Sequence, residues 1–295
     1  MIVCPDCESQ LPALDAERCE QCGRVFERQD GMPALLATAD LQEPIMRAYR
    51  EHYEQIAADD LAGGFQPEDH MELEADRLRE AVGAVEGLTV CDVGVGKGML
   101  LERLAADRPR SLVGVDLARP YLRRLAGRED VALVLANAER LPFRSEFDVI
   151  VSSDVLEHVL NVGDFLVSVH DALRPAGRFV VRVPHLDRLT IYATQRGYRY
   201  RFVHLRAFDG RGLRRLLQEA GFDVTRMLYS GFYAARRRRL FGVHPQVDIR
   251  VQRALNRRFG GAGSVTRIDP RIGRVLMQPN VVTAVASKRT GEATA

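Results

Sequence analysis

A glycine-rich stretch, VCDVGVGKGML, contains residue types that commonly bind a nucleotide-like ligand. Gly94, Gly96 and Gly98 follow an apolar run and precede a helical pattern. Their spacing differs from the G-x-G-x-x-G pattern of dinucleotide-binding loops, because the third glycine position of that pattern is occupied by Met99. Asp92 lies two residues before the first glycine, where a carboxylate would repel a pyrophosphate. The same carboxylate would attract an ammonium or a sulfonium group, so the stretch predicts a loop that binds a cationic ligand.

Four cysteines near the N-terminus have the spacing of a metal site. Cys4 and Cys7 form one C-x-x-C pair, and Cys19 and Cys22 form another. Four thiolates can complete the tetrahedral shell of a Zn²⁺ ion, and a filled shell leaves no open position for catalysis. The alternatives are a disulfide pair, which no secretion signal supports, and a redox-active motif, which needs only one pair at the start of a helix. We therefore expect a structural zinc site.

The elements that must position these residues follow from an alternation of short apolar runs and helical patterns after residue 88. Such alternation predicts right-handed crossovers and a parallel sheet that helices cover on both faces. The expected fold class is α/β, with a doubly wound, mostly parallel, seven-stranded sheet and a small N-terminal zinc ribbon. The predicted strands are residues 88–93, 111–116, 131–137, 147–153, 177–184, 222–229 and 280–288, and the main helices are residues 98–107, 119–127, 162–173 and 209–222.

The chain divides into three expected segments. Residues 1–36 form the zinc ribbon, residues 41–86 carry two helical patterns, and residues 87–295 form the main domain. An arginine-rich insert at residues 231–278 separates the last two predicted strands and contains four consecutive arginines at 236–239.

Five motifs along the main domain resemble, in order, those of class I S-adenosylmethionine-dependent methyltransferases with a type 11-like core. The first is the glycine loop with Asp92, and the second is Asp116 at the end of a predicted strand. The third, NAERLPF, is similar to the family's D-A-E-x-L-P-F, the fourth contains its L-E-H sequence, and the fifth, LRPAGR, is similar to its L-K-P-G-G turn. The resemblance implies a Rossmann-like methyltransferase sheet and S-adenosylmethionine as the methyl donor.

The resemblance also implies which residues bind this cofactor. Asp116 matches the acidic residue that holds the ribose hydroxyls, and Asn137 replaces the usual Asp beside the adenine. Asn137 can still accept a hydrogen bond through its carbonyl, but without a charge, so we expect the backbone of Ala138 to carry part of the adenine contact. The expected cofactor-binding residues are Asp92, Gly94, Val95, Gly96, Gly98, Asp116, Leu117, Asn137, Ala138, Ser152 and Ser153.

The N-terminal region resembles that of a subset of these enzymes, in which two C-x-x-C pairs precede a D-G-x-P-x-L sequence, here residues 30–35. Family members often place a helix before the core as a lid over the cofactor. Tyr49 and Tyr53 lie one turn apart in the first helical pattern. This helix is therefore expected either to cover the cofactor or to pack on the sheet.

Methyl transfer to a hydroxyl group is helped by positioning and by a base that removes the acceptor proton. Ligands of doubly wound sheets bind at the carboxyl ends of the strands, which is where Asp154 and His185 are expected. His204 precedes the next predicted helix. These three residues are the catalytic candidates, and a structural hydrogen-bonding role is the alternative for each histidine. His158, in the L-E-H sequence, is expected to be structural.

The charge distribution bears on the methyl acceptor. The formal net charge is only +2, but residues 231–260 contain eight arginines and a single acidic residue, Asp248. Such a stretch fits RNA phosphates, an anionic small substrate or membrane surface, or a solvated arginine-rich face. We expect O-methylation of a small molecule, such as a sugar, a lipid-linked compound or another secondary metabolite. The alternatives are methylation of an rRNA or tRNA base, and cofactor binding without catalysis.

The composition is that of an ordinary globular protein, with 46% hydrophobic residues among 295. No apolar run approaches the roughly 18 residues that a membrane helix needs. The first residues lack the basic and apolar regions of a signal peptide. A cytoplasmic protein without a transmembrane segment is therefore expected.

Overall fold

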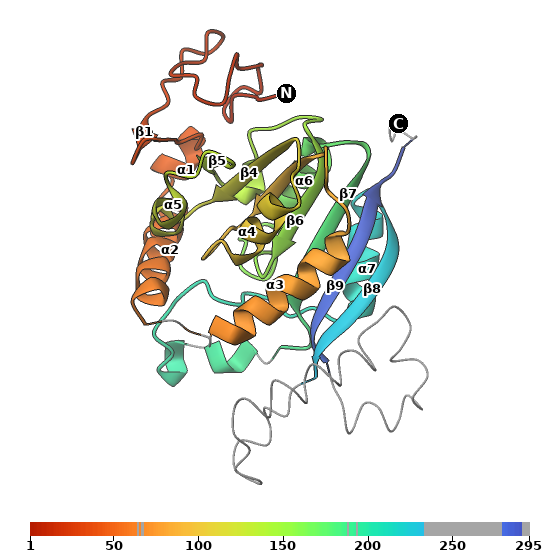
Figure 1. The fold of residues 1–295 in the computed structure, drawn as a ribbon. Coiled ribbons are helices and arrows are strands. Elements are labelled where there is room, and N and C mark those ends of the chain that lie inside the picture. The colour runs from red at the N-terminus through yellow and green to blue at the C-terminus, as the bar shows by residue number, and fades with distance from the viewer. Residues whose placement is uncertain (64, 66–67, 188, 193, 233–278, 291–295) are drawn as a thin grey trace.

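A computed structural model describes residues 1–63, 65, 68–187, 189–192, 194–232 and 279–290 (Figure 1). The four consecutive arginines and nearly all of the arginine-rich insert lie outside the described residues. Within the part of the chain that is described, no helix is long and apolar enough to cross a membrane.

Seven strands form the central sheet. They are β3 (Thr89–Val93), β4 (Ser111–Asp116), β5 (Ala132–Leu135), β6 (Phe147–Ser153), β7 (Leu173–Pro184), β8 (Phe222–Phe232) and β9 (Pro279–Lys288). Their order in the sheet is β5-β4-β3-β6-β7-β9-β8. The strands from β3 to β7 pair in parallel, and β9 pairs antiparallel with both β7 and β8. The strand order reverses at β3, which is where doubly wound sheets bind ligands.

Helices cover both faces of the sheet, as Figure 1 shows. They are α3 (Glu68–Val82), α4 (Met99–Ala106), α5 (Arg119–Leu125), α6 (Val162–Ala172) and α7 (Gly210–Glu219). Successive strand residues point to opposite faces. In β6, Val149 and Val151 join an apolar cluster with α3, α4 and α5, whereas Ile150 joins a cluster with α6 and α7. The predicted fold class, a doubly wound and mostly parallel seven-stranded sheet, is thereby confirmed.

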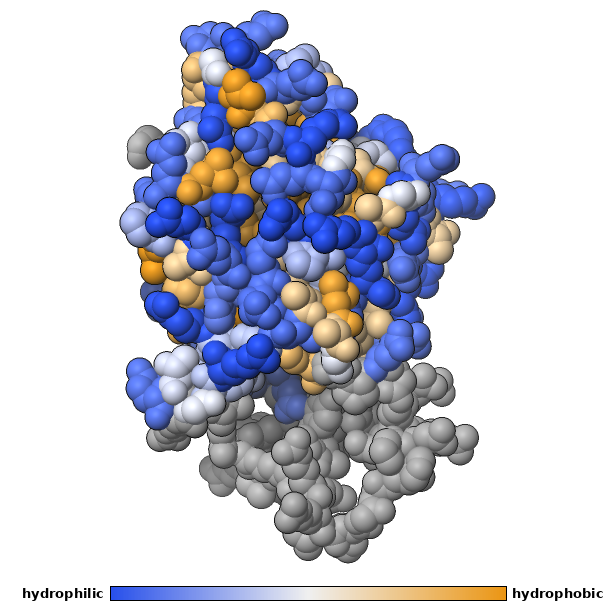
Figure 2. Space-filling model, turned by 90° about the vertical axis from the view of Figure 1, so that its left-hand side faces the viewer, coloured by the Kyte–Doolittle hydropathy of each residue, from blue (hydrophilic) through white to orange (hydrophobic). Residues whose placement is uncertain are grey.

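Two further helices, α1 (Thr38–Gln42) and α2 (Pro44–Gly63), precede the sheet. Pro44 suits the first turn of α2, because its missing N–H would have no partner inside the helix. This helix packs against α5. It lies on the left of Figure 1, and the face seen from that side is mostly hydrophilic in Figure 2.

The N-terminal cysteine segment docks on one edge of the sheet. A hairpin of β1 (Arg28–Gln29) and β2 (Met32–Pro33) leads from the cysteines to this edge. There Ala34 forms a parallel bridge with Leu135 of β5, and the N–H of Leu35 donates to the carbonyl of Leu135 at 2.9 Å. Side chains from this segment belong to the same apolar cluster as α6 and α7, namely Cys4, Leu11, Cys19, Phe26 and Leu35. The cysteine segment therefore shares its core with the sheet.

Candidate cofactor and acceptor sites

The three glycines of the loop after β3 all have left-handed backbone angles, with φ of +82° at Gly94, +51° at Gly96 and +83° at Gly98. A Cβ atom at Gly94 would overlap Val155, and one at Gly98 would overlap Leu125. A Cβ atom at Gly96 would have no protein atom within 4 Å. Packing therefore requires glycine at the two outer positions, whereas Gly96 leaves its backbone open to the close approach of a ligand.

Asp116, at the end of β4, is fixed against this loop by backbone donors. Its Oδ2 accepts the N–H of Gly96 at 3.1 Å, and its Oδ1 accepts the N–H of Ala118 at 2.8 Å. Burial raises the pKa of Asp116 to about 6, although these backbone donors oppose the rise. Burial, with the nearby charge of Asp116, raises the pKa of Asp92 to about 8. Two partly protonated carboxyl groups beside an open glycine backbone can accept a cationic ligand that carries ribose hydroxyls.

The remaining loop residues expected to bind the cofactor surround these carboxyl groups. Val95 is buried in the apolar cluster of α4, and Leu117 packs against the same cluster. Their side chains are therefore occupied by packing.

Asn137 follows β5 and has protein partners on both ends of its amide. Its Oδ1 accepts the N–H of Glu139 at 3.0 Å, which caps the short 3₁₀ helix η1 (Ala138–Arg140). Its Nδ2 donates to Asp40 of α1 at 2.8 Å. The carbonyl that was expected to accept from adenine is thus already hydrogen-bonded within the chain, and its role toward adenine stays a prediction.

Glu139 was not among the candidates, yet it holds two loops of the site together. Its side chain is 7% exposed, and its two oxygens accept the N–H groups of Leu160 and Asn161 at 2.8 and 3.0 Å. The third residue of the N-A-E sequence thereby fastens the end of β5 to the segment after β6.

The end of β6 carries Ser152, Ser153 and Asp154. Ser152 is fully buried, and its hydroxyl has no hydrogen-bond partner among the described residues. The guanidinium of Arg182 lies 3.1 Å from the Ser153 hydroxyl and 2.5 Å from the carboxylate of Asp154. It also pairs with the buried Glu74 of α3 at 3.1 Å. Asp154 is therefore neutralised by a cation, which suits positioning better than proton abstraction.

A group of side chains just beyond β6 and β7 is a candidate site for the methyl acceptor. We call it the acceptor cluster and define it as Glu157, His158, Asp187, Tyr192 and His204. Nδ1 of His204 lies in close contact with a carboxylate oxygen of Asp187. The ring of Tyr192 stacks on that of His204, with centroids 4.1 Å apart and planes 11° apart. Glu157 is 1% exposed, and burial raises its pKa well above the usual value. The cluster thus combines an oriented imidazole with a buried carboxyl group.

His158 holds the cluster together. Its Nδ1 accepts the backbone N–H of His204 at 3.2 Å, and the two rings meet edge to face at 4.8 Å. Burial, reinforced by His204, lowers the pKa of His158 to about 3, so the ring is neutral. This arrangement agrees with the structural role expected for His158.

Four of the nine described non-glycine residues with a positive φ lie in or near this cluster. Asp154, Leu186, Phe202 and His204 are not glycines, yet their φ angles are +55°, +55°, +54° and +46°. Left-handed conformations of such residues persist only where surrounding contacts impose them, and they are frequent at functional sites.

His185 packs against β8 and hydrogen-bonds to β9. Its backbone N–H donates to the carbonyl of Asn280 at 2.6 Å, and its ring packs edge to face on Tyr229 of β8 at 5.4 Å. Of the two histidines proposed as bases from the sequence, the structure brings His204 to the acceptor cluster.

Helix α2 covers the two sites. The hydroxyl of Tyr49 donates to the carbonyl of His158 at 3.3 Å, and that of Tyr53 donates to the carbonyl of Phe202 at 2.9 Å. At the other end of α2, Asp60 pairs with Lys97 of the glycine loop at 2.9 Å. The helix therefore contacts both the cofactor loop and the acceptor cluster.

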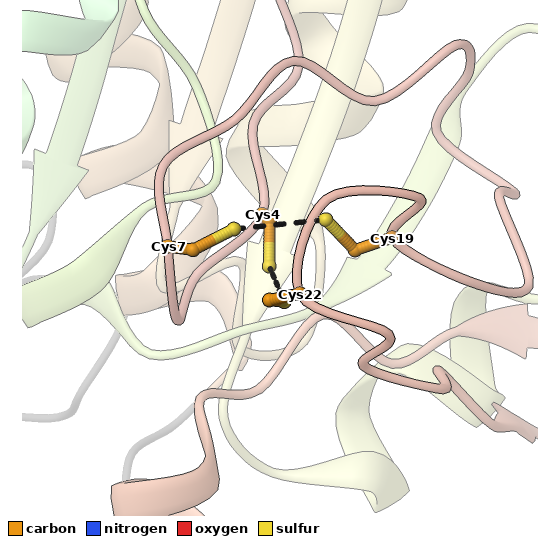
Figure 3. Close-up of side chains that lie close together, drawn as sticks. All are labelled: Cys4, Cys7, Cys19 and Cys22. Carbon is orange, nitrogen blue, oxygen red and sulfur yellow. Dashed lines mark hydrogen bonds between the residues drawn. The ribbon is translucent and has the colours of Figure 1, made fainter.

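The four N-terminal cysteines meet with their sulfur atoms pointing toward one another (Figure 3). Cys4 and Cys22 are 3.7 Å apart at sulfur, Cys7 and Cys19 are 3.6 Å apart, and all four sulfurs lie within 4.8 Å of one another. These distances exceed the roughly 2.05 Å of a disulfide. They match the separation of about 3.8 Å between ligands of a tetrahedral zinc with Zn–S bonds of about 2.3 Å.

The two halves of the ribbon repeat one backbone pattern. The N–H groups of Cys4 and Cys19 each donate at 2.8 Å to the carbonyl five residues later. The N–H groups of Glu8 and Gly23 each donate back to those cysteines at 2.9 Å, and both residues have a positive φ. Each C-x-x-C pair is therefore bent into the same turn, which directs its two thiols to one point.

The fold and the cofactor loop together define the class of this protein, a class I S-adenosylmethionine-dependent methyltransferase. The chain belongs to the methyltransferase domain family, which matches residues 64–227.

Sequence relatives match only part of the chain. A tRNA U34 carboxymethyltransferase from Shewanella loihica is 31% identical over 119 residues, which cover 38% of this chain and 36% of the relative. The enzyme of the same name from Pseudoalteromonas translucida is 32% identical over 112 residues, or 36% and 35% of the two chains. The match thus spans about a third of the length of these relatives.

Solved structures share the fold. A chain from the complex between the Haloferax volcanii Trm112 methyltransferase activator and a methyltransferase has a TM-score of 0.58 and 17% identity, covering 83% of this chain and all of that chain. The 1,6-didemethyltoxoflavin-N1-methyltransferase of Burkholderia thailandensis has a TM-score of 0.54 and 20% identity, covering 84% and 91% of the two chains.

Proposed function

We propose that the protein transfers the methyl group of S-adenosylmethionine to a hydroxyl group of a small molecule, such as a sugar or a lipid-linked compound. The observation that carries this proposal is the close contact between Asp187 and Nδ1 of His204, beyond the carboxyl ends of β6 and β7. Asp187 lies against Nδ1 of His204 and leaves Nε2 to take up a proton, which is the arrangement of a general base.

The residues proposed for the cofactor are those of the glycine loop, Asp92, Asp116 and the ends of β5 and β6. When bound there, S-adenosylmethionine supplies a methyl group already activated by the sulfonium, so the protein contributes mainly orientation. Asp116 accepts the ribose hydroxyls, and the open backbone of Gly96 lets the ligand approach. Asp92 offers a carboxylate to the cationic end of the ligand.

The proposed reaction is an in-line displacement. Toward a methyl donor held in line with the acceptor oxygen, Nε2 of His204 would take the proton of the acceptor hydroxyl. Asp187 stabilises the imidazolium that results. Asp154, held by Arg182, orients the segment that leads to Glu157.

The covered acceptor cluster favours a small acceptor. The side chains of Asp187 and His204 are each only 16% exposed. Segment 198–202 lies against α2, where the hydroxyl of Tyr200 donates to Asp59 at 2.9 Å and the N–H of Arg201 donates to His52 at 2.6 Å. A tRNA acceptor, suggested by the names of the sequence relatives, would require this cover to move.

We further propose that Cys4, Cys7, Cys19 and Cys22 hold a structural Zn²⁺ ion. The support is the geometry of the four sulfurs and the repeated turns that direct them. Because four thiolates fill a tetrahedral shell, this ion would stabilise the ribbon and take no part in methyl transfer.

Transfer of labelled methyl groups tests the proposed function. The protein is incubated with methyl-labelled S-adenosylmethionine and either a small-molecule extract or total tRNA and rRNA. Label is expected in small molecules, and label in RNA alone would overturn the proposed acceptor. If neither small molecules nor RNA become labelled although the protein still binds the cofactor, the protein is a cofactor-binding protein without methyltransferase activity.

Two variants test the proposed base. His204→Ala is expected to lower turnover by about 10²–10⁴-fold with cofactor affinity retained. His185→Ala is the comparison, and a loss confined to His185→Ala would move the base to that residue.

A further inference from the structure

A series of hydrogen bonds connects the cysteine ribbon to the loop that carries Asn137. It begins at Asp6, which lies inside the first C-x-x-C pair. Its two oxygens accept the N–H of Thr38 at 2.7 Å and the hydroxyl of Thr38 at 2.8 Å. Arg24, which follows the second cysteine pair, lies 3.3 Å from the same carboxylate. Asp6 therefore joins both halves of the ribbon to the first residue of α1.

Helix α1 carries the second part of this connection. Asp40, two residues after Thr38, is fully buried. Its carboxylate accepts hydrogen bonds from the N–H of Ala37 at 3.0 Å, from Asn137 at 2.8 Å and from Arg140 at 3.2 Å. Because α1 has only five residues, a displacement of its first residue is passed on to Asp40.

The chain just before α1 is fixed to the same loop from another side. Ala34 is bridged to Leu135, and the N–H of Leu35 donates to the carbonyl of Leu135, which lies two residues before Asn137. The segment from Ala34 to Asp40 thus holds β5 and the turn after it along their outer edge. No other described segment supplies a carboxylate to the Asn137 amide.

We infer that Asp6 is a positioning residue of the cofactor site, through which the metal-loaded ribbon holds the Asn137 loop in its binding arrangement. This inference rests on the proposed function for the identity of the cofactor and of the metal. A ribbon that only stabilised the fold would change the unfolding temperature without changing cofactor affinity. A ribbon that positions the loop changes the affinity of a protein that is still folded.

The test measures binding of S-adenosylhomocysteine by calorimetry to the full-length, zinc-loaded protein and its variants. Asp6→Ala removes the acceptor for Thr38 and leaves all four cysteines in place. It is expected to keep its zinc and to bind the ligand about tenfold more weakly. Asp15→Ala is the matched control, because Asp15 is an exposed ribbon carboxylate whose ion pair, with Arg28 at 3.5 Å, stays within the ribbon. Its affinity is expected to equal that of the wild type.

Hydrogen exchange supplies a second readout. Amides of residues 34–40 and 137–140 are expected to exchange faster in Asp6→Ala than in Asp15→Ala. Wild-type affinity in an Asp6→Ala protein that retains zinc would overturn the inference. If Asp6→Ala loses zinc, Thr38→Val decides instead, since it leaves the ribbon intact: weaker binding supports the inference and unchanged binding overturns it. Absence of binding by the wild type would count against the proposed function and not against this coupling alone.

Discussion

Asn137 donates a hydrogen bond from Nδ2 to Oδ1 of Asp40 at 2.8 Å, although 97 residues separate the two in sequence. Their exposed fractions are 3% and 0%, so neither side chain can turn to water instead. An aspartate at position 137, as in the motif that this segment resembles, would place a second carboxylate against Asp40. The amide at this position is therefore explained by its partner on α1.

Asn137→Asp is expected to lower the free energy of unfolding by about 2–4 kcal/mol, because a buried donor is replaced by a like charge. Denaturant unfolding measures the change. In the double variant with Asp40→Asn, the amide donor is on residue 40 and the carboxylate acceptor is on residue 137. This variant should recover most of the lost free energy of unfolding. A double variant as unstable as the single one would show that this pair does not account for the cost.

Most of the sheet could be predicted from local pattern. The strands expected at 111–116 and 147–153 occur with those bounds, since their apolar runs end at polar residues or turns. The strand expected from 177 instead begins at Leu173, which pairs with Phe147 across an irregular register. A pairing of this kind depends on a neighbouring strand and leaves no local pattern.

The candidate site was predictable only where its residues are neighbours in sequence. The cofactor loop is a local sequence, so its glycines and Asp116 could be identified together. Asp187 and Glu139 act through contacts with residues distant in sequence, at His204 and at Leu160, and a single sequence does not show them. The face of the sheet on which His185 lies could have been predicted. Side chains alternate along a strand, so His185 points to the face opposite Arg182, which pairs with Glu74 of α3.

Gly96→Ala is expected to weaken binding of S-adenosylmethionine by at least about tenfold, since its methyl group would enter the space where the backbone is open. Gly127→Ala is a matched control, because Gly127 also has a positive φ, +88°, and open space around a Cβ. Both variants should lose about 1–2 kcal/mol of stability to the left-handed backbone. Equal cofactor affinities in the two variants would remove Gly96 from the binding site.

The affinity for S-adenosylmethionine should rise with pH. Asp116 has a pKa of about 6 without ligand, because burial favours its protonated form. An ionised carboxylate accepts the ribose hydroxyls more strongly, so binding below pH 6 must first release a proton. Asp116 alone predicts an increase of about tenfold between pH 5 and pH 7. Asp92, whose pKa is about 8, steepens the rise because its carboxylate is proposed to meet the cationic end of the ligand. Calorimetry in buffers of different ionisation enthalpy measures the number of protons released on binding. Asp116→Asn should bind the cofactor weakly and should lose the part of the pH dependence that Asp116 causes.

Cys22→Ser is expected to abolish zinc binding and to lower the unfolding temperature, because three thiolates no longer close the tetrahedral shell. Cys22 is exposed, so the loss cannot be attributed to packing in the core. Cys91→Ala provides the opposite control: Cys91 is buried in β3, and its removal should reduce stability while leaving the zinc content unchanged. Elemental analysis of the purified proteins measures zinc directly. Full zinc occupancy in Cys22→Ser, or none in the wild type, would contradict the four-cysteine site.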